Sequence, residues 1–296
     1  MFPRRRPALS PSEVELDGPF RHELVHTRGL RLHAAVAGDP GDPLVVLLHG
    51  AFGGWFEFRE VIAPLAEHGL FVAAVDARGY GLSDKPPSTA GDDLRTAAGD
   101  IAGLIRSLGH ERAIVVGADT GGTVAWALAA NYPELVAGLV SVSAAHPVDL
   151  RRAIAARPWF HLRTVARPLM SLSGATAYRR HLAASCTPEF RRTPAFGEEL
   201  RLRLRASQIS HARAAVGRTN RLLTASVSSR WLNTTVQAPT LLIQPPLPMW
   251  RHLARRSVQR VSGEMTVRPV SHSRHLPHLE NPAGFVDAVA AFAAVA

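Results

Sequence analysis

A buried apolar run meets a helical segment at Val115-Val116-Gly117-Ala118-Asp119-Thr120-Gly121-Gly122. The pattern Gly-x-Asp-x-Gly is typical of a tight turn that lifts its central side chain above a sheet. The neighbours of that side chain must be small, and glycine or alanine occupies these positions. The helix N-terminus beneath favours negative charge on the central residue. The stretch therefore predicts Asp119 as an exposed nucleophile, although the same residues also suit a turn in which Asp119 only caps the helix.

Apolar, β-branched runs alternate with helical patterns on both sides of this turn. The expected strands cover residues 44–48, 70–75, 113–116, 139–143, 240–243 and 264–267. The expected helices cover residues 58–68, 96–108, 121–131 and 285–295. This alternation predicts βαβ units, and hence an α/β fold with a mostly parallel central sheet and helices on both faces.

The strand signal stops in the middle of the chain. We predict that residues 146–237 form a helical cap inserted into an α/β core made of residues 20–145 and 238–296. Between residues 147 and 235 there are sixteen arginines against four carboxylates. Residues 1–19 lack an apolar period and are expected to form a flexible tail.

Composition excludes some function classes. The net charge is +10, yet no arginine run is interleaved with aromatic residues as in a nucleic-acid groove. We therefore expect no nucleic-acid partner, and we favour GC-rich codons as the explanation of the arginine content over a basic surface for acidic lipid or an anionic substrate. No apolar run is long enough to span a membrane. The single cysteine, Cys186, excludes an internal disulfide and fits a reducing compartment, so a cytoplasmic location is expected.

A second turn follows an earlier strand, at Leu47-Leu48-His49-Gly50-Ala51-Phe52-Gly53-Gly54-Trp55. We predict that the backbone N–H of Ala51 or Phe52, together with the N–H of Thr120, forms an oxyanion hole above the nucleophile. The His49 side chain is expected to fix the turn rather than to react. The loop over residues 76–86 is likewise interpreted as structural.

A general base is predicted near the C-terminus, in the segment before the final helix. This segment holds His272, His275 and His278. A base must come from a loop at the carboxyl end of the sheet, and His275 fits that place best. His272 lies early, and His278 is expected to point back towards the helix. No carboxylate is spaced to complete a metal site, so neither a metal nor a cofactor is predicted.

Taken in this order, the segments resemble the α/β-hydrolase superfamily over residues 22–145 and 238–296, with 146–237 as the cap. The Gly-x-Asp-x-Gly-Gly elbow and the Ala145-His146-Pro147 segment resemble its epoxide hydrolase branch. The resemblance implies a small hydrophobic substrate and two chemical steps. Asp119 opens an epoxide and forms an ester, and His275 then activates water that releases a diol.

The sequence departs from the family pattern in ways that predict weakened turnover. Pro248 stands where the acid partner of the histidine is expected, and Asp149 is the nearest candidate acid. Tyr178 is the only tyrosine of the insertion and therefore the only candidate tyrosine donor to the epoxide oxygen. Phe52 and Ala118 replace a proline and a histidine of the pattern. Without an acid partner, the ester on the nucleophile should be hydrolysed slowly.

Three alternative functions remain open. A haloalkane or haloacid dehalogenase shares the aspartate nucleophile, but Thr120 and Ala51 supply none of the side-chain halide donors that the resemblance leads us to expect there. A serine-type esterase would have to use Thr120 or Ser143, and neither lies at the apex of the elbow. A catalytically weakened hydrolase-fold protein could instead bind a hydrophobic ligand or partner through its arginine-rich cap.

Overall fold

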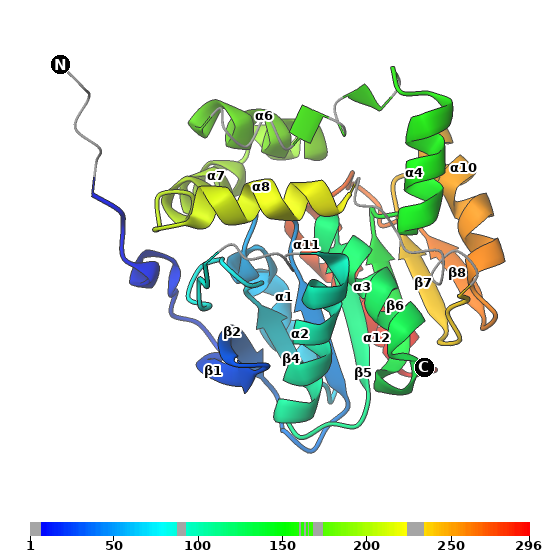
Figure 1. The fold of residues 1–296 in the computed structure, drawn as a ribbon, viewed down its shortest axis with the longest axis horizontal. Helices are drawn as coiled ribbons and strands as arrows, with labels where there is room; N and C mark the ends of the chain where they lie inside the picture. Colours follow the sequence, from blue (N-terminus) through cyan, green and yellow to red (C-terminus); the bar gives the residue numbers. More distant parts are fainter. Residues whose placement is uncertain are drawn as a thin grey trace.

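The computed structural model describes residues 7–87, 93–159, 161–162, 164, 166–167, 174–223 and 234–296. One eight-stranded sheet organises the core, in the order β1-β2-β4-β3-β5-β6-β7-β8 (Figure 1). The strands are β1 (Arg21–Thr27), β2 (Leu30–Ala37), β3 (Leu44–Leu48), β4 (Phe71–Val75), β5 (Ala113–Ala118), β6 (Val136–Val142), β7 (Thr240–Ile243) and β8 (Met265–Arg268). All neighbours from β4 to β8 are parallel, which confirms the predicted fold class.

An antiparallel hairpin at one edge was missed by the sequence patterns. Strands β1 and β2 pair antiparallel, and β2 continues antiparallel to β4. The hairpin turn consists of Arg28 and Gly29, both with positive φ (46° and 77°). Two-residue hairpin turns of this kind usually begin with asparagine, aspartate or glycine. Because arginine occupies the first position here, the sequence pattern did not predict the turn.

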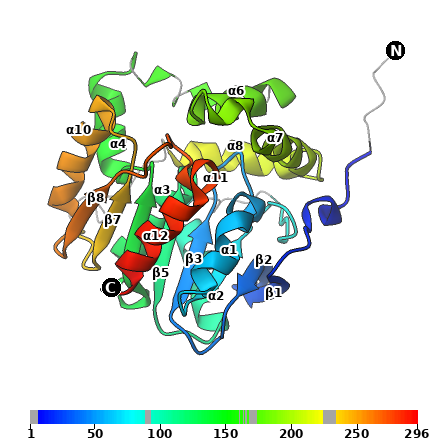
Figure 2. The ribbon, with the colours of Figure 1, turned by 180° about the vertical axis from the view of Figure 1, so that it is seen from behind.

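Helices cover both faces of the sheet, as predicted. On one face lie α2 (Leu94–Ser107) and α3 (Thr120–Asn131), and on the other α1 (Arg59–Ala66) and α12 (Pro282–Ala293) (Figures 1 and 2). The side chains of β3 alternate between these layers: Leu44, Val46 and Leu48 join the first apolar cluster, and Val45 and Leu47 join the second. Burial on both faces explains why the strands read as continuous apolar runs.

The helices between β6 and β7, in the segment predicted as a cap and called the cap below, lie over the carboxyl ends of the parallel strands (Figure 1). The described helices of the cap are α4 (Pro147–Ala156), α6 (Ala175–Ser185), α7 (Pro194–Ala206) and α8 (Ala212–Leu222). The core is completed by α10 (Pro248–Ser257) and α11 (Pro277–Glu280). Short 3₁₀ turns occur at η1 (Pro11–Val14), η2 (Trp55–Phe58), η3 (Pro133–Leu135), η5 (Phe190–Arg192) and η6 (Val258–Arg260). None of the helices in the described ranges combines the length and the apolar character that a bilayer crossing needs.

Part of the N-terminal segment, which was expected to be flexible, packs against the rest of the molecule. Leu9 forms a β-bridge with Ile209, between α7 and α8 of the cap. Val14 is fully buried, and its carbonyl accepts a hydrogen bond from Trp55 Nε1 at 2.9 Å. The segment therefore contacts both the core and the cap within the described residues.

Candidate active site

Asp119 occupies a strained turn between β5 and α3. Its backbone angles are φ 52° and ψ −116°, a conformation that L-residues rarely adopt and that costs roughly 1–3 kcal/mol. Its side chain makes no helix-capping hydrogen bond. The backbone N–H donates to the carbonyl of Val142 at 3.1 Å, which ties the turn to β6. The turn therefore has the elbow geometry rather than that of an ordinary helix cap.

Close backbone packing explains the glycines around the elbow. A Cβ atom on Gly117 would lie 2.5 Å from the carbonyl oxygen of Gly121. A Cβ on Gly121 would lie 2.3 Å from the carbonyl oxygen of Leu48 in β3. Because the obstructing atoms belong to the backbone, they cannot rotate away. The elbow thus requires glycine where the sequence pattern predicted small residues.

Gly121→Ala should destabilise the fold by about 1–3 kcal/mol, since the new methyl group collides with the backbone of β3. The matched control is Gly197→Ala in α7, where an added Cβ meets nothing within 4 Å. There alanine should stabilise the helix by about 0.5–1 kcal/mol. Urea unfolding of the two variants measures both changes. Equal unfolding midpoints for Gly121→Ala and wild type would contradict the packing explanation.

The turn after β3 faces Asp119. A Cβ on Gly50 would come within 3.0 Å of Asp119 Oδ2. The predicted oxyanion-hole residues Ala51 and Phe52 follow directly and are buried. On the other side, Thr120 follows Asp119 directly as the first residue of α3, and its backbone N–H helps to lower the pKa of the Asp119 carboxyl. The start of the turn after β3 and the first residue of α3 therefore both adjoin Asp119, and the role of the three predicted amides in catalysis stays a prediction.

His49 fixes this turn, as predicted. Its Nε2 accepts a hydrogen bond from the N–H of Ala77 at 3.1 Å. Its Nδ1–H donates to the carbonyl oxygen of Gly50 at 2.7 Å. Both ring nitrogens are occupied by backbone groups. The side chain therefore orients the loop and does not face a substrate.

A cap arginine that the sequence did not single out binds the Asp119 carboxylate. Arg167 Nη1 lies 2.7 Å from Oδ1, and Nη2 lies 2.5 Å from Oδ2. Arg167 Nε donates to Asn220 Oδ1 of α8 at 2.9 Å, and the guanidinium carbon lies 5.6 Å from the centre of the Phe52 ring. Burial by itself would raise the pKa of Asp119. The guanidinium outweighs that effect and holds the pKa well below its usual range.

The predicted base shares a cavity with the predicted nucleophile. Asp119 and His275 both line a cavity of about 290 Å³ beneath the cap. The His275 ring lies 5.7 Å from the ring of Trp250, and its backbone N–H donates to the carbonyl of Ser185 at 2.9 Å. The fold thus brings together residues 156 positions apart in the sequence, as the pattern implied. Whether they act as nucleophile and base stays a prediction.

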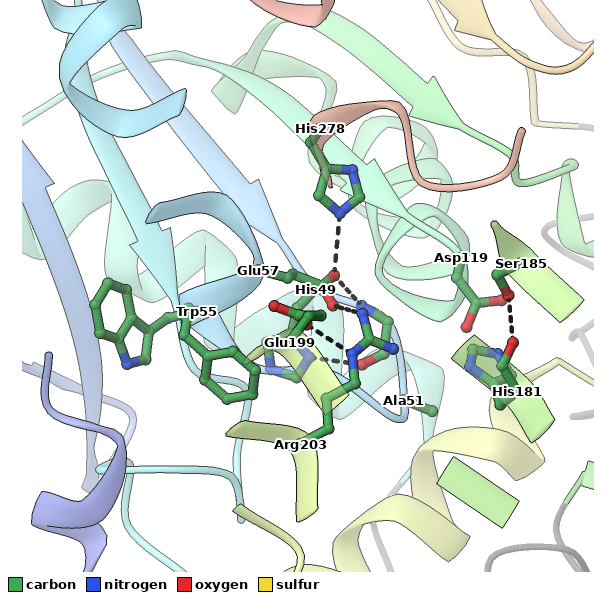
Figure 3. Close-up of polar contacts among 12 residues, drawn as sticks. His49, Ala51, Trp55, Glu57, Asp119, His181, Ser185, Glu199, Arg203 and His278 are labelled. Carbon is green, nitrogen blue, oxygen red and sulfur yellow. Dashed lines mark hydrogen bonds and ion pairs between the residues drawn. The ribbon is translucent and has the colours of Figure 1, made fainter. Parts of the chain in front are cut away.

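The ring of α6 that lines the cavity is His181. It lies beside Asp119 in Figure 3 and contacts the Phe52 ring at 4.5 Å between centroids. Burial, and then the charge of Arg167, lower the pKa of His181 well below its usual value, so the ring is neutral. Within the described residues its Nδ1 is buried without a hydrogen-bond partner.

Tyr178, the predicted cap donor, lies one turn earlier on α6 and packs edge-to-face against Phe52. It is outside the described lining of the cavity. Burial raises its pKa to about 12, so the phenol keeps its proton. That Tyr178 donates to the epoxide oxygen stays a prediction. The structure does not favour it, because His181 of the same helix lines the cavity and Tyr178 does not.

The candidate acid Asp149 pairs with an arginine. It lies on α4, nearly fully buried, and its carboxylate oxygens are 3.1 and 3.3 Å from nitrogens of Arg260. Pro248, where the family pattern expects an acid, is the first residue of α10. The structure therefore assigns Asp149 an ion-pair partner, and its action on His275 stays a prediction.

A buried charge network, also missed from sequence, supports the turn after β3 (Figure 3). Glu57 accepts the N–H of Gly50 at 3.1 Å and pairs with Arg203 of α7 at 2.9 Å. Arg203 also binds Glu199 at 2.7 Å, and His278 Nε2 lies 3.7 Å from Glu57 Oε1. Burial alone would raise the pKa of Glu57, but His278 and Arg203 together lower it. Cap and turn are therefore joined by charges in the protein interior.

Comparison with known proteins identifies the family. A family model described as alpha/beta hydrolase fold matches residues 43–244. The chain belongs to the alpha/beta hydrolase fold family. This α/β hydrolase is 44% identical over 132 residues to AB hydrolase superfamily protein YfhM of Bacillus subtilis, covering 45% of the chain and 46% of that protein. It is 43% identical over 125 residues to Epoxide hydrolase B of Mycobacterium tuberculosis, covering 41% and 35%.

The α/β hydrolase thus spans less than half the length of these curated relatives. The crystal structure of Epoxide Hydrolase A from Mycobacterium thermoresistibile superposes with a TM-score of 0.74, over 93% of this chain and 98% of that one, at 23% identity. That likeness shows the fold. The relatives include epoxide hydrolases, as the resemblance predicted. In the described part of the chain, no cluster of three or more His, Cys, Asp or Glu is placed to hold a metal ion.

Proposed function

We propose that this α/β hydrolase opens an epoxide to a diol through a covalent ester on Asp119. The observation that carries the proposal is the carboxylate on a strained elbow, facing a cavity that His275 also lines. The similarity to proteins named epoxide hydrolases supports the choice of electrophile. A carboxylate already ionised at neutral pH needs no base in order to attack.

In the first step, one oxygen of Asp119 forms a bond to an epoxide carbon while the carbon–oxygen bond of the ring breaks. The epoxide oxygen takes the electron pair and accepts a proton from water. The neutral His181 ring carries one N–H and lies beside the nucleophile, so it can donate a hydrogen bond to the developing alkoxide. The product is a hydroxyalkyl ester, and Asp119 has lost its charge.

In the second step, His275 takes a proton from a water molecule, and the hydroxide attacks the carbonyl carbon of the ester. The N–H of Thr120 and an N–H of the Ala51–Phe52 turn would stabilise the tetrahedral oxyanion. The diol oxygen leaves with the proton from His275. The regenerated carboxylic acid loses its proton, which balances the one consumed in the first step.

Isotope labelling tests this route. In a single turnover in ¹⁸O-water, the label should enter the Asp119 carboxylate and not the diol, because water attacks the ester carbonyl. Mass spectrometry of the peptide that holds Asp119 measures both the label and any accumulated ester. A persistent ester would reveal slow hydrolysis. Unlabelled Asp119 with a labelled diol would overturn the covalent route.

Matched substrates separate the alternative functions. Halide release from 1-chlorobutane, without diol formation from an epoxide, would move the assignment to a dehalogenase. If neither an adduct on Asp119 nor a diol forms, the alternative of a hydrolase-fold protein that binds a ligand without turnover would be favoured. Labelling by diisopropyl fluorophosphate would indicate a serine-type nucleophile instead.

Ester formation should be nearly independent of pH between about pH 4 and pH 8. The pKa of Asp119 is held well below its usual range, so the carboxylate stays ionised throughout this window. Rapid quenching followed by mass spectrometry measures the rate of ester formation at each pH. An ester-formation rate that falls about tenfold per pH unit below about pH 6 would show that a different group controls attack.

A further inference from the structure

Two contacts besides the pair with Asp119 hold the Arg167 side chain. Asn220, fully buried on α8, accepts from its Nε, and Phe52, also buried, faces the guanidinium. These two contacts fix the plane of the guanidinium and direct both terminal nitrogens towards Asp119. The Arg167 side chain is only 12% exposed. The protein therefore holds the two terminal nitrogens of Arg167, both hydrogen-bond donors, next to the carboxylate of Asp119.

The proposed reaction creates a charge problem at this site. Both oxygens of Asp119 are bound by Arg167 in the resting state, and one must be released before attack. Once the ester forms, Asp119 is neutral and the buried guanidinium has lost its counter-charge. An uncompensated charge in a cavity is strongly unfavourable. A neutral epoxide offers Arg167 only its ring oxygen, which ends as an uncharged hydroxyl once the ester has formed and leaves the guanidinium without a lasting counter-charge.

We propose that the substrate of this site carries a carboxylate next to its reacting carbon and that Arg167 binds this carboxylate. This inference rests on the proposed function and specifies its substrate class. The incoming carboxylate competes for the terminal nitrogens of Arg167, which frees an oxygen of Asp119 for attack. After esterification the same carboxylate remains as the counter-charge of Arg167.

The other charged residues that line the cavity also favour a substrate with a carboxylate. Asp119 is the only carboxylate among its described lining residues, and Arg274 lines it together with Arg167. Esterification therefore leaves a wall with positive charge and no negative charge among these residues. A planar carboxylate suits the guanidinium because two parallel hydrogen bonds match its fork. That is the arrangement Arg167 already makes with Asp119.

A binding experiment tests the site without turnover. Cyclopropanecarboxylate has the shape of an epoxy acid but cannot react, and cyclopropanecarboxamide is its neutral counterpart. Asp119→Asn removes the competing carboxylate, so calorimetry should show cyclopropanecarboxylate binding about tenfold to hundredfold tighter to this variant than to wild type. The carboxamide should show no such gain. Equal behaviour of the two ligands would overturn the inference.

Further variants assign the effect to Arg167. Adding Arg167→Gln to Asp119→Asn should abolish the gain for the carboxylate. Adding Arg167→Lys should keep only part of it, because lysine lacks the planar fork. Arg201→Gln in α7, an exposed cap arginine, is the control and should change nothing. A gain that survives Arg167→Gln would show that another group receives the carboxylate.

Kinetics separates this inference from the proposed function. Wild-type protein should hydrolyse oxirane-2-carboxylate with a kcat/KM at least about tenfold higher than oxirane-2-carboxamide, and Arg167→Gln should remove that preference. Equal hydrolysis of both substrates would overturn the carboxylate preference while leaving the epoxide hydrolase proposal intact. Tight, Arg167-dependent binding of cyclopropanecarboxylate with no ester or diol from either oxirane would instead overturn the proposed reaction and keep the site.

Discussion

Asp119→Asn is expected to abolish ester formation and to lower kcat by about 10⁴-fold to 10⁶-fold, the range found when a nucleophile is removed. The carboxamide has the same shape but carries no charge, so it does not attack an epoxide carbon. The fold should survive, because asparagine tolerates positive φ better than most residues. Arg167 loses its counter-charge, but Asn220 and Phe52 still hold it.

Mass spectrometry after incubation with a reactive epoxide checks this expectation. The wild-type peptide containing Asp119 should gain the mass of the epoxide, and the Asp119→Asn peptide should not. The matched control is Asp84→Asn, a surface carboxylate paired with Arg31, which should keep full ester formation. An ester elsewhere in the Asp119→Asn protein would show that a different residue is the nucleophile.

The elbow could be predicted because its signal is local, and the place of His275 at the cavity could be predicted from chain order. A tight strand-to-helix turn needs small residues around its apex, and Gly121 and Gly122 appear directly in the sequence. The parallel strands follow from apolar runs that are buried on both faces. The position of His275 follows from chain order, because loops at the carboxyl ends of parallel strands meet at one edge of the sheet.

The cap residues could not be predicted in the same way. Arg167 is one of sixteen arginines in an insertion with four carboxylates, so neither composition nor spacing distinguishes it. Its contact with Asp119 depends on how the cap docks on the core. His181 and Tyr178 share a helix at a spacing of three, and only the docking angle decides which ring faces the cavity. The β1–β2 hairpin was missed because its turn begins with Arg28 and not with a residue typical of such turns.

Glu57→Ala is expected to destabilise the protein by about 3–5 kcal/mol, the cost of breaking a buried ion pair from one side. Arg203 and the Glu57 carboxylate are both 1% exposed, and the substitution also leaves the N–H of Gly50 without its acceptor. The turn is built around this carboxylate, since a Cβ on Gly53 would lie 1.8 Å from Glu57 Oε2. The melting temperature should fall by about 10 °C.

The control for this change is Glu60→Ala, three residues further on. The Glu60 side chain is 62% exposed and its pair with Arg59 spans 3.4 Å, so its loss should cost less than about 0.5 kcal/mol. Because the pKa of Glu57 is lower in the folded state, its contribution is present above the unfolded pKa of about 4.3 and is lost as pH falls. The difference in unfolding free energy between wild type and Glu57→Ala should therefore shrink in acid. A loss of unfolding free energy no larger than that of Glu60→Ala, or one that grows in acid, would contradict this explanation. The buried charges would then not hold the turn after β3 to the cap.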